Sequence, residues 1–296
     1  MNLLVFGHGY TSAAFLHRLE GRLGGAVATV RSPDKAARLA QPGLAVRVLS
    51  DEAADPAIPA DIAAADAILV SVPPGPAGDP VLQLFEGAIA AAPRLRWLGY
   101  LSTVGVYGDH DGAPVDENAP TRPKSARSVE RLAAERAWLA LGERSGKAVA
   151  VFRLAGIYGP GRGPFFKVRA GTAQRIVKPG QVMNRIHVDD IAAVLEASLD
   201  RPRPGAIYNV ADDEPAPPGD VVAFAADLAG VPPPPEVDFA TADLSPMARS
   251  FYGENKRVLN GRVRDELGVR LAYPTYREGL RAVAAAEGFL GCHPRA

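Results

Sequence analysis

Apolar and polar positions alternate in blocks along the first half of the chain, and these blocks predict strands separated by helices. Several of the apolar runs are apolar nearly throughout, as in a sheet that is covered on both faces. The runs that predict strands are residues 2–6, 26–30, 45–49, 67–72, 97–102 and 148–154. Helix-like patterns lie between them at 11–22, 34–40, 80–92 and 126–144. This order predicts an α/β protein built on a doubly wound parallel sheet.

The second half of the chain is less regular. After about residue 155, Gly- and Pro-rich segments separate one strand-like run at 206–211 from helix-like patterns near 189–199, 219–229, 256–267 and 275–287. We expect residues 1–155 to form the main domain, with later strands and helices from about 184–212 interleaved into it. Residues 156–296 are expected to form mainly a smaller substrate-binding lobe.

The composition is that of a globular protein with a large core: 296 residues, 47% of them apolar and 22% charged. Lys+Arg and Asp+Glu both total 33, so the net charge favours a small-molecule ligand over a nucleic acid or a membrane. The lone cysteine, Cys292, cannot form an internal disulfide, and the scattered histidines suggest no metal site. The opening apolar run, residues 3–6, is too short for a signal peptide. We therefore expect a cytoplasmic monomer or homodimer.

The first predicted strand runs directly into "GHGYTS", residues 7–12. Gly7 and Gly9 fall at a strand-to-helix turn, where missing side chains let backbone N–H groups approach a pyrophosphate. Ser12 replaces the third glycine of the usual dinucleotide fingerprint and is still small. The loop predicts a dinucleotide site, and a plain tight turn is the alternative. The residues that we expect to bind the cofactor here and at the end of the fourth strand are Gly7, Gly9, Tyr10, Thr11, Ser12, Ser71, Val72 and Pro73.

The second predicted strand ends in "TVRSPDK". Arg31 and Ser32 occupy the corner where an NAD site would place an acidic residue, and Lys35 is nearby. A guanidinium at this corner suits a 2′-phosphate through its charge and its bidentate geometry. The sequence therefore favours NADP as the cofactor over NAD. Alternatively, Arg31 is a solvated loop residue.

Four segments resemble the extended short-chain dehydrogenases/reductases, in the same order. They are 100–138, which contains "STVGVYG" and "RLAAE", then "FRLAGIYGPGR" (152–162), "NRIHVDDIA" (184–192) and "IYNVADDEP" (207–215). Together with "GHGYTS" and the ending "NGRVRDELGVRLAYPTYREGL" (260–280), the chain looks most like the atypical NAD(P)-dependent epimerase/dehydratase-like proteins. The resemblance covers nearly the whole chain. It implies a Rossmann domain that binds NAD(P) and a C-terminal lobe that holds a small substrate, often a nucleotide sugar.

In that family a Ser/Thr and a Tyr-x-x-x-Lys pair carry the chemistry. The resemblance places Thr103 at the Ser/Thr position, while the "RLAAE" register places Arg127 and Arg131 at the tyrosine and lysine positions. Because arginine stays protonated, Arg127 cannot cycle as a general acid and base. Two cations on one helix face can instead bind a carboxylate, a phosphate or an oxyanion. The alternatives are a surface helix in which Arg131 pairs with Glu135, or a helix shifted in register.

If a proton is transferred, another group must supply it. The titratable candidates in the matching segments are Tyr107, Tyr158, Asp109, His110 and His187, and of these Tyr107 joins Thr103, Arg127 and Arg131 as a catalytic candidate. His187 has a simpler interpretation, in which it orients the entry to a helix that Asp189 caps. The candidate substrate-binding residues are Tyr158, Phe166, Arg169, Arg175 and Asn184.

Two functions agree with these residues. One is an NADP-dependent oxidoreductase or epimerase-like enzyme with atypical acid/base chemistry, acting on a small anionic or sugar-like substrate. The other is a catalytically inactive protein that senses or reports NADP(H) to a partner. The retained Thr103 and the substrate-lobe signatures favour the enzyme, and the missing Tyr/Lys pair favours the sensor.

Overall fold

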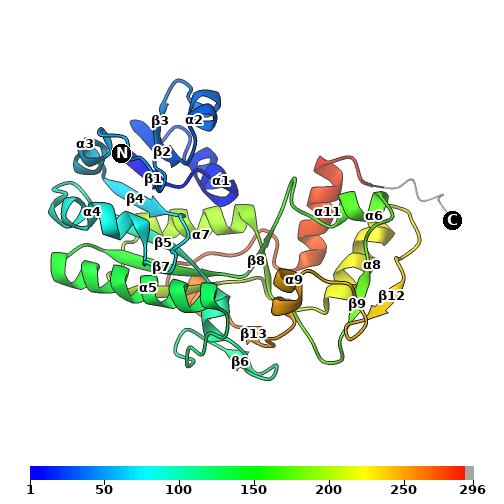
Figure 1. The fold of residues 1–296 in the computed structure, drawn as a ribbon. Coiled ribbons are helices and arrows are strands. Elements are labelled where there is room, and N and C mark those ends of the chain that lie inside the picture. The colour runs from blue at the N-terminus through cyan, green and yellow to red at the C-terminus, as the bar shows by residue number, and fades with distance from the viewer. Residues whose placement is uncertain (291–296) are drawn as a thin grey trace.

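The computed structural model of the protein describes residues 1–290, so Cys292 lies outside the described residues. The chain folds into two lobes that lie side by side (Figure 1). The larger lobe is built around a seven-stranded sheet with the strand order β11-β7-β5-β4-β1-β2-β3. All of its neighbouring strands are parallel, which confirms the predicted doubly wound parallel sheet.

The strands of this sheet lie where the apolar runs predict them. They are β1 (Asn2–Phe6), β2 (Gly25–Val30), β3 (Leu44–Val48), β4 (Ala67–Val70), β5 (Trp97–Thr103), β7 (Val149–Leu154) and β11 (Ala206–Val210). The helices that accompany them are α1 (Tyr10–Arg18), α2 (Pro33–Leu39), α3 (Ile58–Ala64), α4 (Pro80–Ala91), α5 (Ala126–Ser145), α7 (Val188–Asp200) and α10 (Gly261–Asp265). Among these, the apolar pattern did not predict α3.

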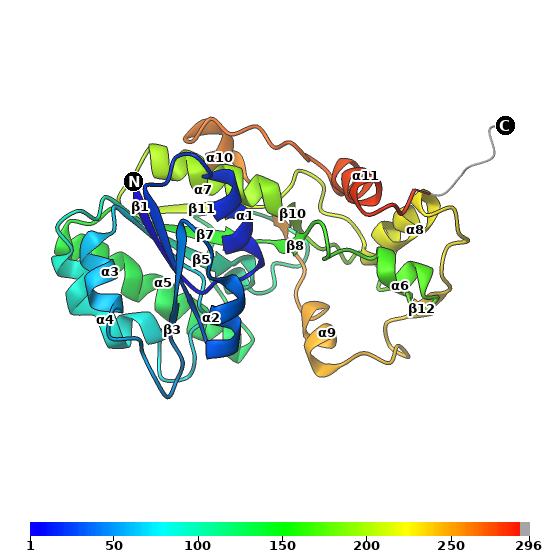
Figure 2. The same cartoon turned by 90° about the horizontal axis from the view of Figure 1, so that it is seen from above.

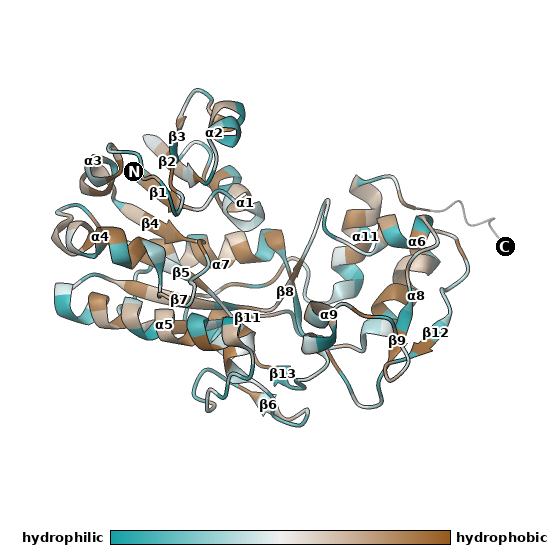
Figure 3. Ribbon diagram, in the orientation of Figure 1, coloured by the Kyte–Doolittle hydropathy of each residue, from teal (hydrophilic) through white to brown (hydrophobic). Residues whose placement is uncertain are grey.

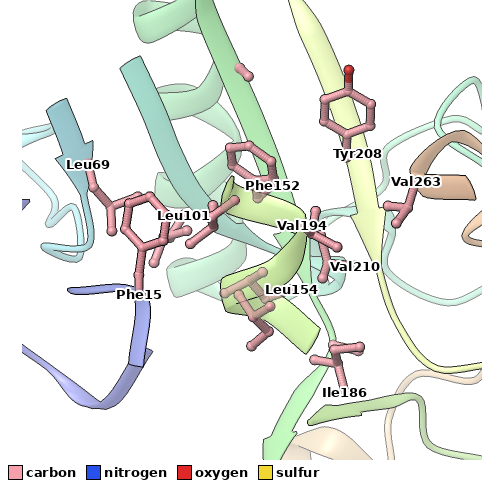
Figure 4. Close-up of a cluster of buried hydrophobic side chains, with 14 of the residues drawn as sticks. Phe15, Leu69, Leu101, Phe152, Leu154, Ile186, Val194, Tyr208, Val210 and Val263 are labelled. Carbon is pink, nitrogen blue, oxygen red and sulfur yellow. The ribbon is translucent and has the colours of Figure 1, made fainter. Parts of the chain in front are cut away.

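Alternate side chains of each strand enter two different hydrophobic clusters. In β1, Leu3 and Val5 pack on the face covered by α1, α7 and α10. Leu4 and Phe6 pack on the opposite face, against α3, α4 and α5. Figure 4 shows the first cluster, in which Phe15 of α1 and Val194 of α7 meet side chains of the sheet. Each fully buried side chain of this size contributes about 1.5–3 kcal/mol to the stability of the folded state. Figure 3 shows that hydrophobic residues follow the strands of the sheet.

The C-terminal lobe has a small core of its own. Its helices are α6 (Phe165–Arg169), α8 (Pro218–Leu228), α9 (Pro246–Phe251) and α11 (Tyr276–Ala286), and short strands pair as β8 (Gly156–Tyr158) with β10 (Arg185–His187) and β9 (Arg175–Val177) with β12 (Glu236–Asp238). Tyr158 packs in this core beside α11. A Cβ on Gly279 would lie 2.0 Å from the Tyr158 hydroxyl, so only glycine allows this approach. Figure 2 shows α9 set apart from the other helices of the lobe.

The helix predicted over 256–267 is wrong in its first part. Only Gly261–Asp265 is helical, as α10, and the preceding Arg257–Val258 forms β13, which pairs with β6 (Pro114–Val115). Val258 N–H also donates to the Asn184 side-chain oxygen at 2.8 Å, so these backbone groups bond across the chain and not within a helix. This segment carries the chain from the C-terminal lobe back to the larger lobe. Within residues 1–290, no helix is both long and apolar enough to cross a membrane.

Candidate active site

The glycine loop between β1 and α1 has the geometry of a phosphate cradle. Gly7 adopts φ +94°, and a Cβ there would lie 3.1 Å from the Val72 side chain. Ser12 donates from Oγ to the Gly7 carbonyl at 2.8 Å and so closes the turn. A Cβ on Gly9, the N-cap residue of α1, would meet no atom within 4 Å. Open space therefore lies above the helix N-terminus, and this space fits the pyrophosphate of a dinucleotide.

The corner after β2 carries positive charge. Arg31 and Ser32 are both exposed there, and Ser32 caps α2 by accepting from the Lys35 N–H at 3.3 Å. Lys35 Nζ donates to the His8 carbonyl at 2.9 Å, which ties this corner to the glycine loop. Burial and the nearby Lys35 charge lower the pKa of His8. Two cationic side chains, Arg31 and Lys35, thus lie at this corner beside the glycine loop.

A cleft of about 670 Å³ opens at the carboxyl ends of the sheet strands, beside the glycine loop. Its lining comes from both lobes. The polar and charged residues that line it are Thr11, Ser71, Ser102, Thr103, Ser125, Arg127, Ser128, Arg131, Arg162, Asn184, Ser250, Glu254 and Lys256. Pro73 lines it as well, so predicted cofactor-binding residues and predicted catalytic residues share one cavity.

Thr103 and the start of α5 form one wall of this cleft. Thr103 ends β5 and caps the short 3-10 helix η1 (Val104–Tyr107), with its Oγ1 accepting from the Gly105 N–H at 3.1 Å. The α5 helix begins at Ala126, after the N-cap Ser125, whose Oγ accepts from the Ser128 N–H at 3.2 Å. The start of this helix agrees with the pattern predicted over 126–144. Arg127 and Arg131 both line the cleft, and their assignment to the tyrosine and lysine positions of the family stays a prediction.

The two arginines have different environments. Arg131 is half-buried and donates from Nη1 to the Leu101 carbonyl at 2.8 Å and to the Tyr100 hydroxyl at 3.1 Å. Arg127 is exposed, and its guanidinium carbon lies 5.8 Å from the centroid of the Phe251 ring. Arg131 therefore connects α5 to the end of β5 through hydrogen bonds, while the N–H groups of Arg127 are available to a ligand.

The alternative pairing of Arg131 with Glu135 on a surface helix is wrong. Glu135 is 1% exposed and forms an ion pair with the buried Arg153, at 2.9 Å between Arg153 Nη2 and Glu135 Oε2. Arg153 also donates from Nη1 to the Tyr107 hydroxyl at 2.9 Å, and Tyr107 donates to Asn209 Oδ1 at 2.6 Å. This buried network holds α5 against β5 and β7.

The other candidate proton donors lie outside the lining of the cleft. Tyr107 is 0% exposed within the Arg153 network, and burial raises its pKa. Tyr158 is buried in the C-terminal core, where burial likewise raises its pKa. Asp109 accepts from the Asn255 N–H and pairs with Lys124, which lowers its pKa to about 2. His110 Nε2 lies 3.2 Å from the Pro120 carbonyl.

His187 has the role that its simpler interpretation describes, although the capping residue differs from the expected one. The N-cap of α7 is His187 and not Asp189: its Nδ1 accepts from the Asp189 N–H at 3.2 Å. The ring is 1% exposed and packs 4.1 Å, between centroids, from the ring of Tyr273. His187 therefore positions the start of α7.

Among the predicted substrate-binding residues, only Asn184 lines the cleft. Its side-chain amide is occupied, since Nδ2 donates to the Lys256 carbonyl at 3.0 Å and Oδ1 accepts from Val258 N–H. Arg175 pairs with Glu236, and Phe166 and Arg169 pack against Phe289. The roles predicted for Tyr158, Phe166, Arg169 and Arg175 stay predictions without support from this cavity.

Sequence reasoning missed the segment Ser250–Lys256. Phe251, Glu254 and Lys256 line the cleft opposite α5. A helix was expected at Lys256, and no motif marked Phe251 or Glu254. The available signal was small: "SFYGENK" combines two aromatic residues and two charges in a segment without a recognisable motif.

The fold and the cavity together define a dinucleotide-binding Rossmann protein whose second lobe completes the cleft. A family model described as "NAD dependent epimerase/dehydratase family" matches residues 81–211. Protein YeeZ of Escherichia coli (strain K12) is 32% identical over 221 residues, which cover 71% of this chain and 72% of YeeZ. The chain belongs to the NAD-dependent epimerase/dehydratase family, as its sequence motifs indicated.

Solved structures agree with this assignment. A functionally unknown conserved protein from Silicibacter pomeroyi DSS is 52% identical, with a TM-score of 0.89 over 96% of this chain and 98% of that chain. The dTDP-glucose 4,6-dehydratase of Bacillus anthracis str. Ames, solved with NAD, is 17% identical, with a TM-score of 0.77 over 97% and 96% of the two chains. The human epimerase family protein SDR39U1 (isoform 2), solved with NADPH, is 18% identical, with a TM-score of 0.72 over 96% and 99%. The last two share the fold alone.

Proposed function

We propose that the protein is an NADP(H)-dependent oxidoreductase or epimerase-like enzyme that acts on a small anionic or sugar-like substrate. The observation that carries this proposal is the single cavity lined by Thr11, Ser71 and Pro73 from the cofactor side and by Thr103 and Arg127 from the other. Family membership supports a nicotinamide cofactor, as do the NAD and NADPH bound to the two solved relatives of the same fold. A nicotinamide bound there would donate or accept a hydride.

The residues of the larger lobe fit NADP(H) better than NAD(H). Gly7, Gly9 and the first turn of α1 would hold the pyrophosphate through backbone N–H groups. Arg31, Ser32 and Lys35 would hold the 2′-phosphate by charge-assisted hydrogen bonds. An NAD-selective site would need a carboxylate for the ribose hydroxyls at the corner that Arg31 and Ser32 occupy.

On the substrate side, Thr103 would orient a substrate oxygen and Arg127 would bind an anionic group. Arg131 would keep the α5 wall in place through the Leu101 carbonyl. Neither arginine can release a proton at a working pH. Any acid/base step must therefore use a different group of the cleft or the solvent.

A second candidate function is an NADP(H)-binding sensor without catalysis. One observation favours it: among the described residues that line the cleft there is no tyrosine and no histidine. Such a protein would bind the cofactor at the same loop and would report its redox state through the second lobe.

Fluorescence titration with NADPH and NADH, followed by a turnover assay with NADP⁺ and a panel of hydroxy acids and sugar acids, tests both functions. Tighter binding of NADPH together with turnover supports the enzyme. Tighter binding of NADPH without turnover of any panel member supports the sensor. If neither cofactor binds, both proposals fail.

We also propose the domain division expected from the sequence, with residues 1–155 and about 184–212 in the cofactor lobe and 156–296 mainly in the substrate lobe. The β13 strand and the α10 helix are exceptions to this division, because Val258 and Val263 pack in the core of the larger lobe. A cytoplasmic location and a monomeric or homodimeric state remain proposals from the sequence. Size-exclusion chromatography with light scattering would determine the oligomeric state.

A further inference from the structure

Lys256 is a buried cation at the junction of the lobes. The residue is 5% exposed and lines the cleft in the segment that faces α5. Lysine is seldom so buried, because an ammonium loses its hydration unless other groups replace it. Within the described lining of the cleft, Lys256 and Glu254 are the only ionisable side chains besides three arginines.

The ammonium of Lys256 has one donor to spare. Nζ donates to the Gly108 carbonyl at 2.7 Å and to Glu254 Oε2 at 2.7 Å. An ammonium carries three N–H groups, and the described residues supply acceptors for two of them. Because Lys256 lines the cleft, the third N–H is available to a ligand there.

The backbone around Lys256 is fixed from two sides. Its carbonyl accepts from Asn184 Nδ2 at 3.0 Å, and the preceding Asn255 N–H donates to Asp109 Oδ1 at 2.9 Å. The Asn255 carbonyl accepts from the N–H groups of His110 and Gly112, both at 3.0 Å. The Lys256 ammonium is therefore held in place before a ligand arrives, which lowers the entropic cost of binding.

The charge of the Lys256 ammonium is balanced by Glu254. A doubly charged phosphate at the free N–H would approach the Glu254 carboxylate and be repelled by it. A carbonyl, hydroxyl or singly charged carboxylate oxygen accepts the same hydrogen bond with less repulsion. Arg127 differs, because within the described residues no ion pair joins it to an acidic side chain. Arg162 shares this property, whereas Arg131 already donates to the Leu101 carbonyl and the Tyr100 hydroxyl. Of the two arginines without a hydrogen-bonded partner among the described residues, Arg127 lies on the same wall of the cleft as Thr103, so we assign the full negative charge to Arg127.

We propose that Lys256 is a substrate-binding residue that donates its third N–H to a carbonyl or hydroxyl oxygen, while Arg127 binds the carboxylate of the same molecule. This inference rests on the proposed function and narrows its substrate class to small hydroxy or keto acids, sugar acids included. Glu254 makes Lys256 favour a carbonyl or hydroxyl oxygen over a phosphate, because the carboxylate of Glu254 balances the charge of the ammonium. The C-terminal lobe thereby supplies a lysine to a cleft in which α5 contributes Arg127 and Arg131.

The test observes the lysine ammonium groups by nitrogen-edited NMR in the full chain, with and without NADP⁺. The protein has six lysines, so the spectrum is sparse, and the signal lost in Lys256→Met identifies Lys256. Added D-glucuronate should shift that signal, whereas D-glucose and inorganic phosphate should shift it much less. Lys256→Met should weaken glucuronate binding about tenfold to a hundredfold, the effect of losing a hydrogen bond to a charged group.

Lys124→Met is the matched control, because Lys124 pairs with Asp109 at 3.1 Å in the same region and lies outside the lining of the cleft. It should leave glucuronate binding unchanged. Glu254→Gln provides a second variant that keeps the lysine: it should raise the affinity for inorganic phosphate. An unshifted Lys256 signal, equal glucuronate affinity in Lys256→Met, or unchanged phosphate affinity in Glu254→Gln would each overturn the inference. If the wild type does not bind NADPH but glucuronate still shifts the NMR signal of Lys256, the result refutes the proposed function and not the role of Lys256.

Discussion

Replacing Arg153 with methionine should destabilise the protein strongly, because it leaves a buried charge without its partner. Arg153 is 4% exposed and Glu135 is 1% exposed. The guanidinium donates to Glu135 from Nε and Nη2 and to the Tyr107 hydroxyl from Nη1. After the substitution the carboxylate keeps only the Ser102 hydroxyl as a donor among the side chains described here.

The size of the expected loss in the free energy of unfolding follows from the burial of the Arg153–Glu135 ion pair. Breaking a buried ion pair by removing one partner costs about 3–5 kcal/mol, whereas replacing both partners with apolar residues is often close to neutral. Arg153→Met should therefore lower the free energy of unfolding by about 3–5 kcal/mol. The double variant Glu135→Leu with Arg153→Met should recover much of that loss, since it leaves no charge buried.

Equilibrium unfolding in urea, applied to both single variants and the double variant, measures the coupling between the two side chains. Arg94→Met is a matched control: Arg94 pairs with Asp66 at 3.0 Å but its side chain is 58% exposed. Its loss should change stability by about 0–1 kcal/mol, as for other surface pairs. A loss below about 1 kcal/mol for Arg153→Met, or strictly additive effects in the double variant, would show that this pair is not desolvated as the structure indicates.

Three further predictions concern the cofactor site and a buried acid. Arg31→Ala should weaken NADPH binding by about 1–3 kcal/mol and leave NADH binding unchanged in fluorescence titrations, because only NADPH carries the 2′-phosphate; an equal loss for both cofactors would contradict this. Gly9→Val should abolish cofactor binding while circular dichroism shows a folded protein, since its Cβ would enter open space that the pyrophosphate needs; retained affinity would rule out the loop as a phosphate cradle. Burial raises the pKa of Asp212 to about 8, so the folded state keeps a proton that the unfolded state loses near pH 4. The contribution of Asp212 to stability should accordingly fall as pH rises from about 4 to about 8, so urea unfolding should show that the stability of the wild type relative to Asp212→Asn decreases over this range; a relative stability that stays constant or rises would refute the assignment.

Periodicity was enough to predict the sheet because its strands are buried on both faces and therefore nearly apolar throughout. It failed where backbone groups bond to distant parts of the chain. Residues 256–260 resemble the start of a helix locally, but Val258 bonds to Asn184 and pairs with β6, contacts that no local pattern contains. The short α9 was missed because six residues give too little periodicity.

The candidate site likewise contains features that depend on local sequence and features that depend on long-range contacts. The glycine loop and Arg31 follow from short motifs whose geometry is set locally, at the ends of two adjacent strands. Glu135 lies four residues after Arg131, and helical spacing alone suggested that the two would pair. The buried Arg153, brought from β7 by the tertiary fold, takes Glu135 instead. Likewise, Lys256 reaches the cleft only because the chain returns from the second lobe.

That return has a mechanical consequence. The backbone crosses between the lobes after β7, between β10 and α7, after β11, before β13 and after α10. A rotation about one pivot would have to bend all of these crossings together, and the crossing before β13 is hydrogen-bonded to both the 108–112 turn and the 180–184 loop. The two lobes therefore resist a hinge rotation that would open the cleft. The α9 helix stands apart from the other helices of its lobe in Figure 2 and places the exposed Phe251 in the lining of the cleft, so a local movement of this short helix would change that border of the cavity without changing the spacing of the lobes.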